Sequence, residues 1–307
     1  MRKIIGIGET ILDILFKNNQ AATSVPGGST FNSMISLGRV GLPSCFVSEI
    51  GDDRVGGIVR SFLSDNGVDD RYLTEYPERK SPISLAFLDD HNNATYSFYK
   101  EPFGKRTDWL CPTIGHDDIV LFGSYYALDP NMRYKVTALL DEARNAGAII
   151  YYDVNFRRNH AGEAIKLMGT VIENLEYADI VRGSDEDFSV LYHIDEGAKV
   201  FKDKVDFYCP RLIYSRGAQG VELYSRTLTK RYLIEPIIPV STIGAGDNLN
   251  AGILYGIIRN RIRRDDLDHL TERDWDDVIR CGLRFSADTC MHTDNYISRE
   301  FAETLDR

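Results

Sequence analysis

The strongest constraint on the fold of this chain is a regular alternation of strand-like and helix-like segments from residue 118 onward. Short apolar runs alternate with segments of helical apolar spacing, with strands expected at 118–123, 148–154, 178–183 and 211–217 and helices at 131–146, 163–176 and 185–192. Successive strands joined through helices pair in parallel, and the helices cover both faces of the sheet. The pattern therefore predicts an α/β fold with a doubly wound, mainly parallel sheet.

The flanking segments fit the same sheet. Further strands are expected at 3–8, 44–51, 220–225 and 230–236, and further helices at 29–40, from Asp52 or Asp53 to about 66, at 246–259 and at 275–291. No low-complexity linker and no repeat of ~20–50 residues is visible, so we expect a single domain over residues 1–307. Sheets of this kind bind ligands at the carboxyl ends of their strands.

Residues 82–102 follow a different pattern. Two runs alternate apolar and polar residues, and the residues His-Asn-Asn at 91–93 separate them. Alternation with a period of two around a polar turn indicates a β-hairpin whose strands are half exposed. We therefore expect a small β element that projects from the main domain.

Composition excludes several classes of protein. The formal net charge of −10 argues against a nucleic-acid-binding protein, because phosphate binding needs a concentrated basic face. No apolar run reaches the ~18–20 residues that span a bilayer, and Glu9 and Asp13 interrupt the one near the N-terminus, which we interpret as a buried strand. The cysteines form no C-x-x-C pair, which favours reduced thiols in the cytoplasm over a structural zinc site.

The most informative segment is residues 239–257. A strand is expected to end at Val240, and the loop Gly244-Ala245-Gly246 then opens directly into a helix. Small residues let backbone N–H groups converge, and the helix N-terminus adds partial positive charge, so the segment predicts an anion-binding hole. Asp247 lies in the first helical turn beside it. The alternative for Asp247 is a residue that only stabilises the helix dipole.

Several motifs in one order carry a family resemblance. The chain reads S-T-I-G-A-G-D at 241–247, and residues 27–56 open with Gly-Gly…Asn and close with G-D-D-x-x-G. Further matches are D-V-N-F-R at 153–157, S-D-E-D at 184–187 and S-R-G-A-Q-G at 215–220. Across nearly its full length the sequence resembles the ribokinase-like (PfkB-type) sugar kinases, and it is most similar in motifs to fructokinase-like members.

The resemblance implies a role for each matching position. Asp247 corresponds to the base that takes the proton of a sugar hydroxyl, and Gly244, Ala245 and Gly246 to the anion hole for the transferred phosphoryl group. The positions that would hold the acceptor sugar are Asp13, Gly28, Asn32, Tyr99, Lys100 and Arg157. Those on the side of ATP would be Ser184, Ser215, Gly217 and Gly220, with Asp187 assigned to Mg²⁺. Residues about 14–26 and 82–102 would form a lid, through which we expect a homodimer.

Each role has a structural alternative. Asp13 could cap a loop after the first strand, and Asn32 could cap or pack within its helix. Arg157 could be a surface residue at a helix start. Gly217 and Gly220 could be ordinary turn glycines.

Departures from the family pattern bear on the substrate. Ser241 replaces a common Asp in a loop that neighbours a monovalent cation in several members, so potassium activation is left open. The S-D-E-D run, the lid segment Y-S-F-Y-K-E-P and D-V-N-F-R are similar to fructokinases and ketodeoxygluconate kinases. We therefore expect fructose or a related ketose as acceptor. The alternatives are 2-keto-3-deoxygluconate and, less favoured, ribose or a nucleoside.

The sequence disfavours two other functional classes. A dinucleotide-dependent oxidoreductase is disfavoured because Ile11 stands where the third Gly of G-x-G-x-x-G belongs. A catalytically inactive sugar-binding regulator is disfavoured because Asp247 and the G-A-G loop are present. The sequence is thus most consistent with an ATP-dependent carbohydrate kinase.

Overall fold

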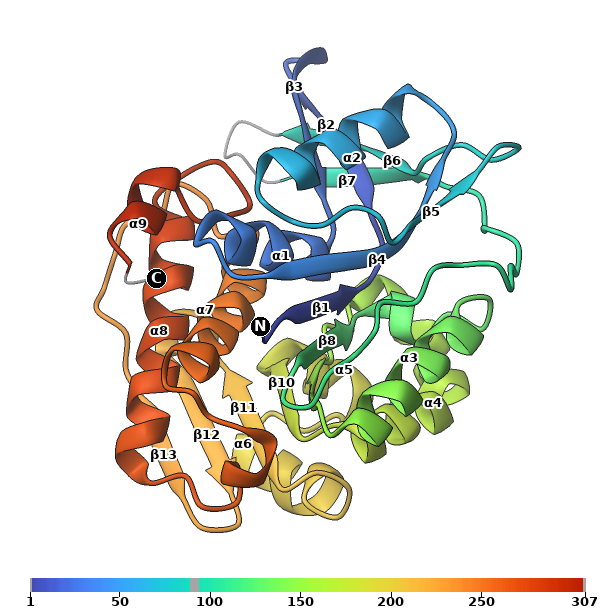
Figure 1. Ribbon diagram of the computed structural model, residues 1–307. Helices are drawn as coiled ribbons and strands as arrows, with labels where there is room; N and C mark the ends of the chain where they lie inside the picture. Colours follow the sequence, from blue (N-terminus) through green and yellow to red (C-terminus); the bar gives the residue numbers. More distant parts are fainter. Residues whose placement is uncertain (1, 89–93, 306–307) are drawn as a thin grey trace.

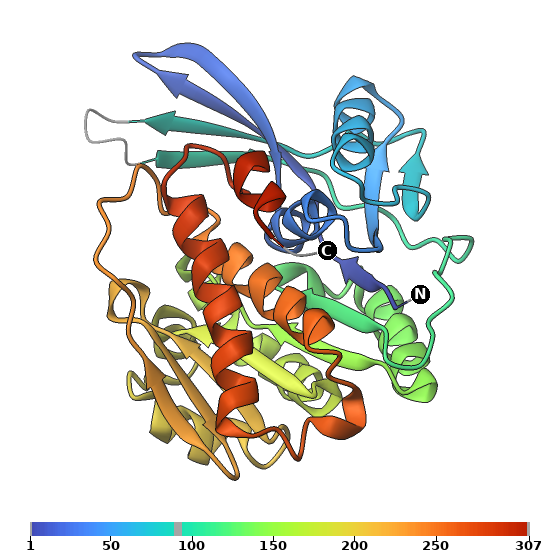
Figure 2. The same ribbon diagram turned by 60° about the vertical axis from the view of Figure 1, so that its left-hand side comes forward.

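The computed structural model describes residues 2–88 and 94–305, which contain one large and one small β-sheet (Figures 1 and 2). In order across the large sheet, the strands are β13 (Thr229–Tyr232), β12 (Val221–Ser225), β11 (Arg211–Ser215), β10 (Ile180–Ser184), β9 (Ile149–Asp153), β8 (Ile119–Gly123), β1 (Ile4–Ile7), β4 (Ser44–Gly51) and β5 (Leu73–Tyr76). Neighbours from β11 to β5 are parallel, and β12 and β13 are antiparallel. The predicted doubly wound, mainly parallel fold is confirmed.

Helices cover both faces of the large sheet (Figure 1). The helices are α1 (Ser29–Arg39), α2 (Arg54–Asp65), α3 (Arg133–Ala146), α4 (Ala164–Tyr177), α5 (Asp185–Tyr192), α6 (Gly197–Val200), α7 (Ala245–Arg259), α8 (Glu272–Cys290) and α9 (Arg299–Glu303). Because side chains alternate along a strand, Ile4 packs in the core formed with α1, α7 and α8, and Ile5 packs in the core formed with α3, α4 and α5. The two apolar cores fix the helices on which the functional residues lie.

The small sheet lies against one side of the large one (Figure 2). Its strand order is β3 (Gln20–Gly27), β2 (Ile11–Lys17), β6 (Ile83–Leu88) and β7 (Ala94–Tyr99). β6 and β7 pair antiparallel, and the turn expected at residues 91–93 lies outside the described residues. Phe16 and Phe87 stack with their ring centroids 4.9 Å apart and join β2 to β6.

Two expectations about the main sheet need correction. The strand expected to end at Val240 is absent: residues 233–239 form no strand, Ile238 is 90% exposed, and the N–H of Val240 donates to the Cys290 carbonyl at 2.8 Å. The segment is apolar, but within residues 2–88 and 94–305 it meets no strand partner beyond the sheet edge at β13. In addition, α8 begins at Glu272 rather than at 275, because Thr271 and Asp274 form a capping box.

Two further observations concern the described residues as a whole. No helix among them has the length and apolar character needed to cross a lipid bilayer. All five cysteines are free, and four of them are buried.

Candidate active site

Asp247 lies in the first turn of α7 and is held by two side chains of α1. Its side chain is buried, with the residue 6% exposed. The hydroxyl of Ser29 donates to Oδ1 at 2.8 Å, and the amide of Asn32 donates to Oδ2 at 2.8 Å. Asn32 therefore contacts the candidate base directly. Ser29, which the sequence analysis did not single out, has the same role.

The loop before α7 requires its glycines. Gly244 is the N-cap of α7 with φ of +79°, and a Cβ there would lie 2.5 Å from the carbonyl oxygen of Asn295. A Cβ on Gly246 would lie 2.9 Å from Nη2 of Arg182. The first turn of a helix leaves backbone N–H groups without helical partners, and these groups together with the helix dipole attract an anion. The loop has the geometry expected of an anion-binding site.

A polar network at the carboxyl ends of β9, β10 and β11 surrounds this helix end. Arg182 Nη1 lies 3.0 Å from Oδ1 of Asp153, and its Nη2 donates to Ser215 Oγ at 2.8 Å. Ser29 Oγ lies 3.3 Å from Oδ2 of Asp153, so one hydroxyl joins Asp153 to Asp247. Arg182 is not among the residues predicted from the sequence. The available signal was a charged residue inside an otherwise apolar strand.

The electrostatic surroundings favour a protonated Asp247 more than water does. The pKa of Asp247 is raised from an ordinary 3.8 to about 6, chiefly by burial, and the charge of Asp153 acts in the same direction. Arg157 and the hydrogen bonds from Asn32 and Ser29 act in the opposite direction. A carboxylate with a raised pKa is suited to accept a proton from an attacking hydroxyl.

The residues expected to bind the acceptor fall into two groups. Asp13 lies inside β2, which excludes a loop-capping role; it accepts a hydrogen bond from Ser84, and burial raises its pKa. Gly28, at the start of α1, has φ of +133°, and a Cβ there would lie 2.2 Å from the Glu9 carbonyl oxygen. A Cβ on Gly27 would lie 3.0 Å from Oδ2 of Asp13 and 3.9 Å from Oδ1 of Asn32, so both side chains lie close to Gly27. The Asn32 N–H donates to the Gly28 carbonyl at 2.8 Å.

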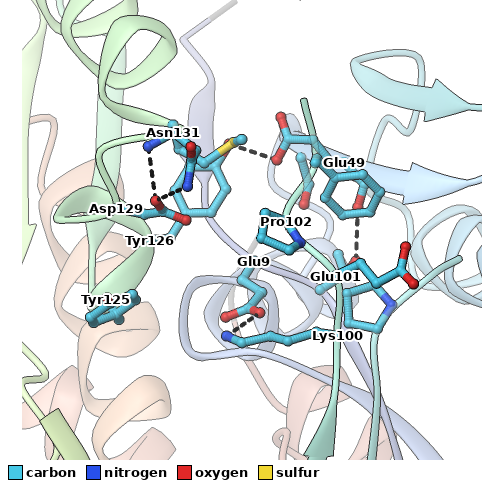
Figure 3. A pocket seen from close by; sticks show the side chains of 14 residues that line it. Glu9, Glu49, Lys100, Glu101, Pro102, Tyr125, Tyr126, Asp129 and Asn131 are labelled. Carbon is cyan, nitrogen blue, oxygen red and sulfur yellow. Dashed lines mark hydrogen bonds and ion pairs between the residues drawn. The ribbon is translucent and has the colours of Figure 1, made fainter. Parts of the chain in front are cut away.

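The second group lies farther out on the surface. Tyr99, at the end of β7, is 58% exposed. Arg157 is also exposed, but it lies close enough to Asp247 for its charge to lower the pKa of that carboxyl. Lys100 Nζ forms an ion pair of 2.9 Å with Glu9. Lys100 and Glu9 line a pocket of about 290 Å³, in which Figure 3 shows their ion pair below Pro102 and beside Tyr125. Asp247 is not among the residues that line this pocket.

The residues expected to bind ATP occupy the ends of β10 and β11. Ser184 and Asp187 form a capping box at the start of α5, with Asp187 Oδ2 accepting from the backbone N–H and the hydroxyl of Ser184. Gly217 is exposed with φ of +50°. Gly220 has φ of +100°, and a Cβ there would lie 2.1 Å from the Tyr232 carbonyl oxygen. Glycine is therefore needed at this position for β12 to pair with β13, whatever the residue's role toward ATP.

No group of three or more His, Cys, Asp or Glu residues within the described parts of the chain is arranged to hold a metal ion. Mg²⁺ in nucleotide sites is held largely by phosphates and water, with one or two carboxylates from the protein. Asp187 is a buried carboxylate of the required hard-donor type at the carboxyl end of β10, near Arg182. Its chemistry fits the magnesium that accompanies ATP.

Comparison with known proteins identifies the family. Residues 1–299 match the pfkB family carbohydrate kinases. The chain belongs to the pfkB family. It is a carbohydrate kinase, an enzyme that phosphorylates a sugar.

Related kinases match over most of their length. The fructokinase of Escherichia coli is 25% identical over 290 residues, which are 91% of this chain and 92% of that protein. The crystal structure of aminoimidazole riboside kinase from Salmonella enterica, complexed with aminoimidazole riboside and an ATP analog, has a TM-score of 0.85 and 20% identity and covers 99% of both chains. A fructokinase from Vibrio cholerae with fructose, ADP and a potassium ion has a TM-score of 0.83 and 20% identity, covering 96% of this chain and 94% of that one. These structures share the pfkB fold.

Proposed function

We propose that this pfkB kinase transfers the γ-phosphoryl group of ATP to a primary hydroxyl of fructose or a closely related ketose, with Asp247 as base. The observation that carries the proposal is a buried carboxylate of raised pKa in the first turn of α7, beside a glycine loop. Phosphoryl transfer depends mainly on positioning and on neutralising charge around the moving group. A base and an anion hole on one helix end supply both.

The proposed steps use residues of three segments. The acceptor hydroxyl donates to Asp247, whose carboxylate is oriented by Ser29 and Asn32 and accepts the proton late in the transfer. The N–H groups of the loop 244–246 bind the transferred phosphoryl group. Mg²⁺, assigned to Asp187, would neutralise phosphate charge when bound.

The remaining contacts to ATP and the acceptor follow from position in the fold. We assign the nucleotide to the edge formed by Ser184, Ser215, Gly217 and Gly220, because it adjoins the phosphoryl site through the hydrogen bond between Arg182 and Ser215. We assign the acceptor to the space between α1 and the small sheet, where the side chains of Asp13 and Asn32 both lie close to Gly27.

Charge near the lid favours a neutral acceptor over a sugar acid. Lys100 would attract a substrate carboxylate, but its charge is already balanced by Glu9 at 2.9 Å. The pocket beside this pair also contains Glu101 and Asp129. A carboxylated sugar such as 2-keto-3-deoxygluconate would therefore have to compete with Glu9 for Lys100, whereas a neutral ketose would not.

A coupled assay of ADP formation tests the acceptor. Fructose, 2-keto-3-deoxygluconate, ribose and nucleosides are compared by kcat/KM under one set of conditions. The proposal expects fructose or another neutral ketose to have the highest value. A clear preference for the sugar acid, for ribose or for a nucleoside overturns it, and sugar binding without turnover would support the inactive regulator.

We further propose that the small sheet closes over the acceptor as a lid and joins two subunits. Phe98 and Tyr99 of β7 are 53% and 58% exposed, and Phe87 is 37% exposed. Exposed aromatic residues on the edge of a small sheet are typical of a surface that another chain covers. Light scattering should give the mass of a dimer, and a monomer across working concentrations removes this proposal.

Two smaller proposals complete the description. The free cysteines favour a reducing compartment, and we propose the cytoplasm, to be tested by cell fractionation. Potassium activation is tested by exchanging K⁺ for Na⁺ in the assay. Ser241 Oγ accepts the N–H of Ile243 at 3.2 Å and carries no charge, so we expect at most a weak dependence.

A further inference from the structure

The guanidinium of Arg182 lies against the phosphoryl loop at Gly246. Arg182 lies on β10, and its side chain is 8% exposed. Its guanidinium lies directly behind Gly246, because a Cβ on Gly246 would be 2.9 Å from Nη2 and 3.2 Å from Nη1. Its Nε is buried and has no hydrogen-bond partner within the described residues.

Burial acts to lower the pKa of Arg182, but the charges of Asp153 and Asp187 outweigh burial and raise that pKa, so the cation is retained. The N-terminus of a helix carries partial positive charge, and cations near it are destabilising unless an anion is also present. Burial of an ion pair is itself costly and needs nearly complete hydrogen bonding to be repaid. Arg182 has one carboxylate partner, Asp153, and an unpaired N–H group. An anion at the start of α7 would be attracted both by this cation and by the partial positive charge of the helix N-terminus.

We propose that Arg182 is a positioning residue for phosphoryl transfer, which holds the start of α7 from behind and keeps a positive charge under the phosphoryl-binding loop. The proposal rests on the assignment of that loop to the phosphoryl group. It does not depend on which sugar is the acceptor.

The fork shape of the side chain explains the choice of Arg. One nitrogen reaches Asp153 on β9 and the other reaches Ser215 on β11, so the guanidinium bridges both neighbouring strands while its face lies against the loop. A Lys would keep the charge, but it would not keep both fixed contacts. The Lys variant therefore separates charge from geometry.

A simpler role must be distinguished from this one. Arg182 could serve only to neutralise Asp153, which is joined to the base through Ser29. In that case, replacing Asp153 by Asn would make Arg182 dispensable. If the charge acts on the phosphoryl group, Arg182 remains necessary when Asp153 is neutral. A double-mutant cycle decides between the two.

The experiment compares Arg182→Met and Arg182→Lys with the control Arg211→Met. Arg211 is also a buried Arg, with its side chain 6% exposed, but it lies at the amino end of β11 and bonds to Asp268 and to backbone carbonyls. All variants are assayed with the acceptor that the wild-type enzyme phosphorylates fastest, below their melting temperatures. A wild type without any acceptor would contradict the proposed function rather than this inference.

We expect Arg182→Met to lower kcat by about 10–100-fold with little change in the KM for sugar, and Arg182→Lys to restore part of the loss. Arg211→Met should lower the melting temperature and leave kcat within about twofold. The same loss on Arg182→Met should be seen in the Asp153→Asn background. The inference is overturned if the Arg182 loss disappears in that background, or if Arg182→Met keeps the kcat of the control.

A binding measurement tests the inference without turnover. ADP with aluminium fluoride imitates the transferring phosphoryl group, whereas ADP alone does not. Arg182→Met should bind ADP with aluminium fluoride about tenfold more weakly and bind ADP alone as the wild type does. Equal weakening of both ligands, or of neither, contradicts a role at the phosphoryl loop.

Discussion

Replacing Asp247 by Asn should inactivate the enzyme and, at neutral pH, stabilise its fold. Burial raises the pKa of Asp247 from 3.8 to about 6, although Ser29 and Asn32 donate hydrogen bonds to it. One pKa unit corresponds to about 1.4 kcal/mol, so ionising this carboxyl in the folded protein costs about 3 kcal/mol more than in the unfolded chain. The neutral amide of the variant avoids that cost.

The sign of the pH dependence follows from proton binding. Between pH 3.8 and about 6 the folded protein binds the Asp247 proton more tightly than the unfolded chain does, so wild-type stability falls as pH rises through this range. The stability gained by Asp247→Asn should therefore be absent near pH 4 and reach up to about 3 kcal/mol at pH 7.5. The site can accept the amide of the variant side chain. Oδ1 of Asn32 is buried without a hydrogen-bond partner in the described structure. Rotation of the Asn32 amide by half a turn would bring this oxygen to face the new NH₂ group and accept a hydrogen bond from it.

Two assays check this prediction. Urea unfolding at pH 4 and at pH 7.5 gives the free energies of unfolding, and ADP formation gives a kcat that should fall by about 10²–10⁴. As a control, Asp118→Asn changes another buried carboxylate, which accepts hydrogen bonds from Lys3 and Gly115 at the amino end of β8. The control should lose stability and keep activity. A variant at Asp247 that is less stable than wild type at pH 7.5, or that keeps near-wild-type kcat, refutes the reasoning.

Other predictions address the surroundings of the base and the core. In the wild type, kcat should fall tenfold per pH unit below about pH 6, and removing the Asn32 donor with Asn32→Ala should move this limb to higher pH in a pH–rate profile. Gly246→Ala would place a methyl group against the Arg182 guanidinium, so it should lower kcat and should lower the free energy of unfolding by about 1–3 kcal/mol. The control is Gly57→Ala, whose new Cβ has no atom within 4 Å. In the same urea titration it should leave the free energy of unfolding unchanged or raise it by up to about 1 kcal/mol. Lys135→Met should destabilise by about 3–5 kcal/mol by chemical unfolding, because it leaves Glu49 as an unpaired buried charge, and a loss under 1 kcal/mol contradicts this.

The spacing of apolar residues along the chain predicted the order of strands and helices, because each element must bury one apolar face. The alternation of short apolar runs and helical spacing gave the order of strands and helices from residue 118 onward, and the helix over 185–192 has the predicted bounds. Patterns fail where neighbours decide the outcome. The apolar residues around Val240 suit a strand, but no edge lies beside them to pair with. The four-residue strand β5 is too short for its own signal and exists because it pairs with β4.

The sequence alone determined the family, the α/β fold and the place of Asp247 behind a glycine loop, because these depend on residues adjacent in the chain. Tertiary structure decided what surrounds that carboxylate. Ser29 lies 218 positions from Asp247, and Arg182 is brought behind Gly246 by the packing of β10 beneath α7. Hydrogen bonds and pKa values depend on distance and burial in space, and neither quantity can be obtained from the spacing of residues along the chain.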